Sequence, residues 1–329
     1  MLKLENHWYR ARLTFLTILL LPLSWLFGIV VSLRRFIYRI KLKKSHRFPV
    51  PVIIVGNITV GGTGKTPLVI WLAQFLKANG YKPGLVSRGI GGERQKKPCW
   101  VSLKSNPREV GDEAVLLAKR SECPVVICIN RVAAVKALLE KSDCNIVISD
   151  DGLQHYALAR DIEIALIDGA RGLGNQYLLP AGPLRERVSR LKQVDFIVKQ
   201  GVADKNEIAM QLQGDHFVSL QNEQFKKPVT EFAGQRVHAM AGIGNPERFF
   251  SQLRKFHLNL IEHVFPDHYL YKKDDINFGD ELPVMMTEKD AVKCKNFVSG
   301  RHWYLPVNAE VDTQLGKEVL EKINQKVSL

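Results

Sequence analysis

Residues 49–66 read PVPVIIVGNITVGGTGKT, and this stretch decides the fold of the chain. A short β-branched apolar run comes first, a glycine-rich loop follows, and helical spacing of apolar residues begins at Lys65. A strand, a glycine loop and a helix in that order are the setting of a phosphate-binding loop, whose usual pattern is GxxxxGK(S/T). Thr59 stands where that pattern has its first glycine. Because the later glycines and the GKT ending are present, we still predict a nucleotide phosphate site.

The remaining groups of this loop suit a nucleotide triphosphate. Gly61, Gly62 and Gly64 let backbone N–H groups turn toward phosphate oxygens, and the helix adds its positive end. Lys65 would reach the β- and γ-phosphates, and the Thr66 hydroxyl would bind Mg²⁺. The predicted nucleotide contacts are Thr59, Val60, Gly61, Gly62, Thr63, Gly64, Lys65 and Thr66.

A second signal is the run NIVISDD at residues 145–151, an apolar strand pattern that ends on Asp150 and Asp151. Adjacent carboxylates at a strand end repel each other unless a cation lies between them, although DDG also occurs in ordinary turns. Together with the upstream GKT, the pattern favours a Mg²⁺ site formed by Thr66, Asp150 and Asp151. The sequence does not distinguish which aspartate would touch the metal.

The identity of the nucleotide follows from a missing motif. Proteins that bind GTP read guanine with NKxD, and the nearest string here is TEKD at residues 287–290, which places Lys and Asp side by side. We therefore predict ATP, with Mg²⁺, as the nucleotide.

Strand and helix patterns alternate along most of the chain, which predicts an α/β fold with a parallel sheet covered on both faces. After about residue 225 the plan of strand, glycine turn and helix starts again. We expect an N-terminal membrane-anchoring helix with a basic collar at 1–48, a P-loop domain of the NTPase type at 49–225, and a smaller C-terminal α/β domain at 226–329.

The N-terminus predicts contact with a membrane. Residues 13–33 carry no charge, and about 20 apolar residues suffice for a helix to cross a bilayer. Basic residues follow, and such a block favours the cytoplasmic side and anionic headgroups. This basic collar consists of Arg34, Arg35, Arg39, Lys41, Lys43 and Lys44. The helix could span the bilayer or lie in its interface. The net charge of +14 fits an anionic membrane surface, and we predict neither a nucleic-acid partner nor an obligate protein partner.

Several polar residues near predicted loops admit both a structural and a functional interpretation. Asp112 and Glu113 begin a helical pattern, where acids cap helices but could also serve as a base. Arg185 lies in PAGPLRERVSRL, as part of a solvated charge run or as a group that neutralises a transferring phosphate. A lone histidine such as His268 is more often structural than catalytic. Further candidate substrate contacts are Ser87, Arg88, Glu113, Gln154, His155 and Glu186.

The motifs VGNITVGGTGKTP, SRG, GDEA, SDDGLQH, LPAGPLRE, FPDHY and TEKDAVK occur in this order. In this the chain closely resembles the tetraacyldisaccharide 4'-kinase family, over nearly its whole length after the apolar segment. The resemblance implies a P-loop kinase at the cytoplasmic face of the inner membrane. It would use ATP and Mg²⁺ to phosphorylate the 4'-hydroxyl of a tetraacylated disaccharide 1-phosphate, which gives lipid IVA.

The resemblance also implies roles for single residues. Asp112 would be the base that activates the sugar hydroxyl, helped by His268, and closure of the two domains would assemble this pair. One departure is Ile90, because the family usually has tyrosine after SRG. Without the resemblance, the alternative is a membrane-docked P-loop ATPase or GTPase that acts as a switch or targeting factor.

Overall fold

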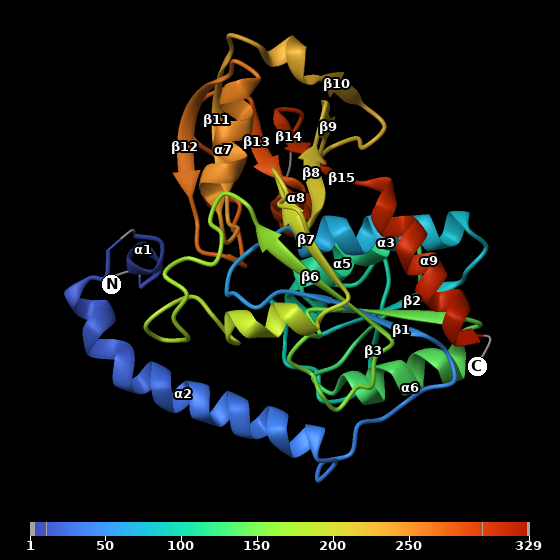
Figure 1. The fold of residues 1–329 in the computed structure, drawn as a ribbon. Coiled ribbons are helices and arrows are strands. Elements are labelled where there is room, and N and C mark those ends of the chain that lie inside the picture. Colours follow the sequence, from blue (N-terminus) through green and yellow to red (C-terminus); the bar gives the residue numbers. More distant parts are fainter. Residues whose placement is uncertain (1–3, 11, 298, 328–329) are drawn as a thin grey trace.

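The computed structural model describes residues 4–10, 12–297 and 299–327, and in these ranges the main strands form a nine-stranded sheet and a six-stranded sheet (Figure 1). The order in the larger sheet is β15-β8-β7-β6-β1-β5-β2-β4-β3. Its strands are β1 (Val52–Gly56), β2 (Pro83–Ser87), β3 (Cys99–Val101), β4 (Val125–Ile127), β5 (Ile146–Asp150), β6 (Ile162–Asp168), β7 (Phe196–Gln200), β8 (Ile208–Gln213) and β15 (Asn308–Val311). The inner strands are parallel, and β15 and β3 close the two edges in antiparallel pairing.

Helices cover both faces of the larger sheet, as its apolar strands require. The alternation along β1 shows why, since Ile53 and Val55 enter one buried cluster and Val52 and Ile54 the other. The helices of this part are α3 (Lys65–Ala78), α4 (Pro107–Val110), α5 (Asp112–Ser121), α6 (Arg131–Lys141) and α9 (Thr313–Val327), with the 3-10 helix η1 (Val188–Gln193). The helices α3, α5 and α9 contribute to the first cluster and α6 to the second.

The smaller sheet has the order β10-β9-β14-β13-β11-β12. Its strands are β9 (His216–Ser219), β10 (Lys226–Pro228), β11 (Arg236–Ala241), β12 (Asn259–Val264), β13 (Val284–Thr287) and β14 (His302–Leu305). The helices around it are α7 (Pro246–Lys255) and α8 (Glu288–Cys294), with the 3-10 helices η2 (Val229–Phe232), η3 (Asp274–Ile276) and η4 (Lys295–Phe297). Figure 1 shows this sheet above the carboxyl ends of the parallel strands.

The strands do not divide between the two sheets at residue 225. Strand β9 already pairs within the smaller sheet, and β15 returns to pair with β8 of the larger one. Helix α9 follows β15 and buries Leu315 and Val319 in the core of the larger sheet. Local sequence patterns predict these elements but do not show which sheet edge accepts them, because that depends on pairing between residues far apart in the chain.

The N-terminal helix α2 (Phe15–Arg39) follows the short helix α1 (Glu5–Trp8) and is, among the described residues, the one helix long and apolar enough to cross a membrane. Its 25 residues extend over about 37 Å. Most of its apolar side chains face outward, and Trp25 is 65% exposed. Figure 1 shows α2 along the outer side of the P-loop part of the chain. Such a contiguous apolar surface indicates an interaction site.

Candidate active site

The predicted phosphate loop connects β1 to α3, as the sequence indicated. Gly61 and Gly64 have φ values of 102° and 92°, in the left-handed region that favours glycine. Thr59 is not among the residues with positive φ, and its buried hydroxyl accepts a hydrogen bond from Asn57 Nδ2 at 3.3 Å. The first position of this loop therefore does not need a glycine, which explains the departure from the usual pattern.

Lys65 lies between the loop and the end of β5. Its Nζ donates to Asn57 Oδ1 at 3.3 Å and lies 3.5 Å from Asp151 Oδ1. Arg185 Nη1 lies 3.1 Å from both oxygens of the same carboxylate. Although burial opposes ionisation of Asp151, Lys65 and Arg185 hold its pKa far below the usual range. Two cations and one carboxylate thus meet beside the phosphate loop.

Asp150 has a different environment from its neighbour. Its Oδ2 accepts a hydrogen bond from Ser87 Oγ at 3.3 Å, whereas its buried Oδ1 has no hydrogen-bond partner within the described part of the chain. Burial, with the negative charge of Glu113 nearby, raises the pKa of Asp150 to about 7. An orphaned carboxylate oxygen beside a phosphate loop fits a divalent cation. No group of three or more His, Cys, Asp or Glu side chains forms a metal cage among the described residues, but Mg²⁺ commonly uses one or two carboxylates and completes its shell with phosphates and water.

Asp112 and His268 lie side by side, although they are 156 residues apart. Asp112 begins α5 and is buried, and its Oδ1 lies 2.9 Å from Nδ1 of His268, which follows the end of β12. Burial alone would raise the pKa of Asp112, but the His268 hydrogen bond and the Lys289 charge lower it to about 2. His268 loses basicity through burial, yet its bond to Asp112 raises its pKa overall. The pair is therefore a carboxylate joined to an imidazole that binds protons readily.

Two lysines on α8 extend this pair, and the sequence analysis did not identify them as site residues. Lys293 Nζ lies 3.5 Å from Asp112 Oδ2 and 2.9 Å from Asp290 Oδ1. Lys289 Nζ donates to Glu113 Oε1 at 3.0 Å and to Asp267 Oδ1 at 3.1 Å. Their spacing of four residues places both lysines on one helix face, a signal that TEKDAVK contained.

The loop between β11 and α7 covers the phosphate loop from the side of the smaller sheet. Arg248 Nη2 donates to Gly62 O at 2.7 Å, and Arg171 Nη1 donates to Gly244 O at 3.0 Å. A side chain at Gly244 would place its Cβ 2.7 Å from Gly62 N, so only glycine allows this approach. Neither arginine was predicted, because their contacts form only when the two sheets meet.

Comparison with known proteins shows the family of this chain. The family model described as "Tetraacyldisaccharide-1-P 4'-kinase" matches residues 16–324. The chain belongs to this family. A tetraacyldisaccharide 4'-kinase of Nitrosococcus oceani is 52% identical over 309 residues, which cover 93% of this chain and 90% of that protein. One of Coxiella burnetii is 49% identical over 324 residues, which cover 98% and 96%.

A solved structure of the same kinase family has the same fold. The "apo" form of LpxK from Aquifex aeolicus, in complex with ATP, superimposes with a TM-score of 0.79 and 29% sequence identity. The match covers 94% of this chain and all of that one (100%). The predicted family and the predicted α/β fold with a P-loop are thereby confirmed.

The remaining residues predicted to contact the substrate differ in their burial and in their hydrogen-bond partners. Gln154 Nε2 donates to Glu186 Oε2 at 2.8 Å, and Tyr156 also donates to the buried Glu186, so these groups satisfy one another. Arg88 is exposed, and burial together with Arg131 lowers the pKa of His155 to about 4. A substrate contact by any of them stays a prediction.

Proposed function

We propose that this site transfers the γ-phosphate of ATP to the 4'-hydroxyl of tetraacyldisaccharide 1-phosphate, which gives the 1,4'-bisphosphate. The observation that carries the proposal is the Asp112–His268 pair beside a phosphate loop. P-loop switches orient the attacking water with a polar side chain, whereas a kinase places a carboxylate against the hydroxyl of its acceptor, and the Asp112–His268 pair is of the second kind.

The groups around the phosphate loop would bind the phosphates of ATP and neutralise their charge. The loop N–H groups and Lys65 would hold the phosphates, and Arg185 and Lys65 would face the charge on the transferring group. Thr66 and Asp150 would hold Mg²⁺, with Asp151 close by. The metal would neutralise phosphate charge and align the γ-phosphate.

The proton of the sugar hydroxyl would pass to the Asp112–His268 pair. Asp112 is ionised at neutral pH because its pKa is about 2, so it can accept a hydrogen bond from the hydroxyl. Because an ionised carboxylate only accepts hydrogen bonds, Nδ1 of His268 would donate to Asp112 and orient it, and the proton of the sugar hydroxyl would go to the Asp112 carboxylate. His268 and Arg248 come from the part of the chain that forms the smaller sheet, and they already contact Asp112 and Gly62 in this structure. This part would therefore cover bound ATP and exclude water.

The acceptor is a lipid, so the kinase must act at a membrane. The exposed apolar side of α2 and the basic collar support attachment to an anionic surface. The basic collar lies at the end of α2 that leads to the P-loop part of the chain, and basic residues that flank a membrane helix favour the cytoplasmic side. The site would therefore lie at the cytoplasmic face of the inner membrane.

The test uses the purified full chain with γ-labelled ATP, Mg²⁺ and the lipid acceptor in mixed micelles, followed by lipid chromatography. Wild type should form a labelled bisphosphate, and Lys65→Ala and Asp112→Ala should each lower kcat by at least about a hundredfold. ATP hydrolysis without a labelled lipid would instead support the switch or targeting factor.

A further inference from the structure

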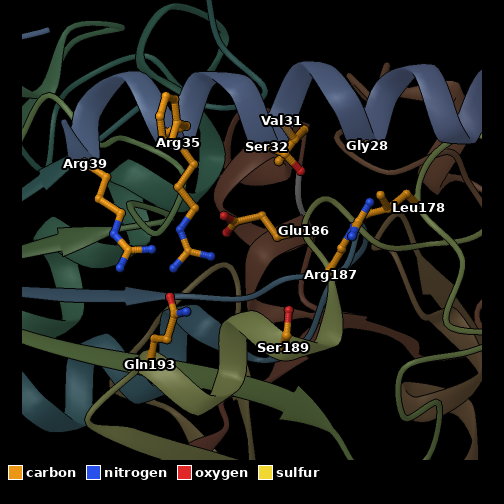
Figure 2. A pocket seen from close by; sticks show the side chains of 11 residues that line it. Gly28, Val31, Ser32, Arg35, Arg39, Leu178, Glu186, Arg187, Ser189 and Gln193 are labelled. Carbon is orange, nitrogen blue, oxygen red and sulfur yellow. The ribbon is translucent and has the colours of Figure 1, made fainter. Parts of the chain in front are cut away.

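The groups that hold the Asp112–His268 pair in place lie on α8, away from the cavity between α2 and the segment that leads into η1. That cavity has a volume of about 580 Å³, and Arg35 and Arg39 extend into it from the helix (Figure 2). Neither Asp112 nor His268 belongs to its lining. Lys289 of α8, in contrast, contacts residues next to both members of the pair.

Lys289 has one ammonium group and three side chains around it. Its Nζ donates to Glu113 Oε1 at 3.0 Å and to Asp267 Oδ1 at 3.1 Å, and it lies 3.5 Å from Nε2 of His268. An ammonium group has three N–H donors, so each of these contacts can use one of them. Glu113 directly follows Asp112 in the chain. Asp267 directly precedes His268, so the lysine joins the two segments that carry the pair.

Helix α8 has contacts of its own with α5. Arg120 Nη1 of α5 lies 2.6 Å from Glu288 Oε2, at the first residue of α8. Lys293 Nζ, one turn after Lys289, lies 3.5 Å from Asp112 Oδ2. Because neither ion pair involves the loop after β12, Lys289 is presented to that loop from a helix that α5 already holds.

His268 depends on such contacts because of its backbone conformation. Its φ is 59°, in the left-handed region that residues other than glycine seldom adopt. Such a conformation persists only where the surrounding structure holds it. Asp267 Oδ1 accepts a hydrogen bond from His268 N at 3.1 Å as well as the one from Lys289, and it thereby connects His268 to α8.

The charge of Lys289 also affects where the ring proton of His268 lies. Although burial opposes this charge, Glu113 and Asp112 raise the pKa of Lys289 above the ordinary range, so it is a cation and only donates hydrogen bonds. Nε2 of neutral His268, which faces this cation, is therefore the accepting nitrogen. The ring proton then lies on Nδ1, which donates to Asp112 Oδ1 at 2.9 Å.

We propose that Lys289 is a positioning residue for phosphoryl transfer, which holds Nδ1 of His268 against the carboxylate of Asp112. The inference rests on the proposed function, because this pair is the group that would meet the sugar hydroxyl. Lys289 would act only through the pair, since an ammonium group cannot itself accept a proton. Its loss should therefore lower kcat and leave the binding of ATP nearly unchanged.

The test uses the purified full chain with labelled ATP and the lipid acceptor in mixed micelles. Lys289→Met removes the ammonium group at nearly the same side-chain length, and kcat should fall by about tenfold or more while KM for ATP stays nearly unchanged. Lys289→Arg keeps the cation and should recover most of the lost kcat. The control is Lys119→Met. Lys119 of α5 also joins the two parts of the chain, through Glu223 at 2.7 Å, but its loss should leave kcat nearly unchanged.

The pH profile of kcat separates positioning from a general loss of structure. The charged groups around the pair come from α5, α8 and the loop after β12, namely Glu113, Lys289, Lys293 and Asp267. Burial and their mutual hydrogen bond have the largest effects on the pKa values of Asp112 and His268, and the charge of Lys289 lowers both. Without this charge the acid limb should move to higher pH by about half a unit or more, whereas Lys289→Arg should keep the wild-type limb.

ATP binding by calorimetry and the midpoint of urea unfolding show whether each variant is folded. The loop after β12 keeps the ring contacts of Phe265 with Tyr269 and Tyr271 when the lysine is removed, so we expect Lys289→Met to fold. If it does not fold, Lys289→Gln takes its place, because the amide keeps N–H donors without the charge. Its kcat and its acid limb should change in the same directions.

The outcomes separate this inference from the proposed function. If wild type forms no labelled bisphosphate, the proposed function fails and this inference fails with it. If wild type is active and the uncharged Lys289 variants keep its kcat, or lose kcat without a shift of the acid limb, Lys289 does not position the pair. An equal loss of kcat in Lys119→Met would also overturn the inference, since the effect would then come from the contact between the two parts in general.

Discussion

Substitution of Lys293 by methionine should destabilise the protein strongly, because this ammonium is buried between two carboxylates. Lys293 is 3% exposed at its side chain and lies 2.9 Å from Asp290 Oδ1 and 3.5 Å from Asp112 Oδ2. At 3.5 Å and an effective dielectric constant of about 20, one such pair attracts by roughly 5 kcal/mol, although desolvation of the charges offsets part of this. Loss of one partner of a buried pair typically costs about 3–5 kcal/mol, which we expect for Lys293→Met.

The carboxylate of Asp290, left without its cation, explains much of this cost and allows a control. Asp290 keeps its hydrogen bonds from Tyr271 Oη, Thr287 Oγ1 and Gly242 N, but would lose its cation. In an Asp290→Asn background, Lys293→Met should therefore cost at least about 1 kcal/mol less than in the wild type.

The assay is urea unfolding in detergent, followed by tryptophan fluorescence, with midpoints and slopes compared across the four proteins. The pH profile of kcat provides a second measurement. Without Lys293 the pKa of Asp112 should rise from about 2, and the acid limb of the profile should move to higher pH. A loss of less than about 1 kcal/mol, or additive effects with Asp290→Asn, would refute the reasoning.

Two further substitutions address the site and its surroundings. Gly91→Ala would place a Cβ 2.5 Å from His268 Nδ1, at a residue with φ of 85°. Because this would displace His268 from Asp112, kcat should fall by about tenfold or more while ATP affinity stays nearly unchanged. An unchanged kcat would show that the Asp112–His268 contact is dispensable. Burial, with Arg131, lowers the pKa of His155 in the folded protein to about 4, whereas the unfolded value is near 6.5. Neutral His155 therefore contributes stability that is present above about pH 6.5 and is lost as the pH falls through about 4. His155→Gln should remove this loss of stability on acidification. The difference between the two proteins should be about 2 kcal/mol after allowance for partial exposure, and equal pH dependence in urea titrations from pH 7 to 4 would contradict it.

The sequence determined the features of this protein that depend on neighbouring residues. The strand, loop and helix around Lys65 follow from local periodicity and from the conformational freedom of Gly61 and Gly64. The strand pattern that ends on Asp150 and Asp151 is local as well, although the pairing of β1 with β5 was needed to bring these carboxylates beside the loop. The apolar helix α2 likewise follows from composition over a single stretch. The order of the motifs then sufficed to indicate the family.

Only the tertiary structure decided how distant segments meet. Strand β9 pairs in the smaller sheet and β15 pairs in the larger one, each with a strand edge formed by residues far away in the chain. The position of Lys293 against Asp112, and of Arg248 against Gly62, depends on the contact between the two parts of the chain. The environments of Asp150 and Asp151 differ through contacts within the larger-sheet part, because Lys65 and Arg185 reach one carboxylate while burial dominates at the other. Electrostatic interactions act through space and vary with burial, so the spacing of residues along the chain does not determine them.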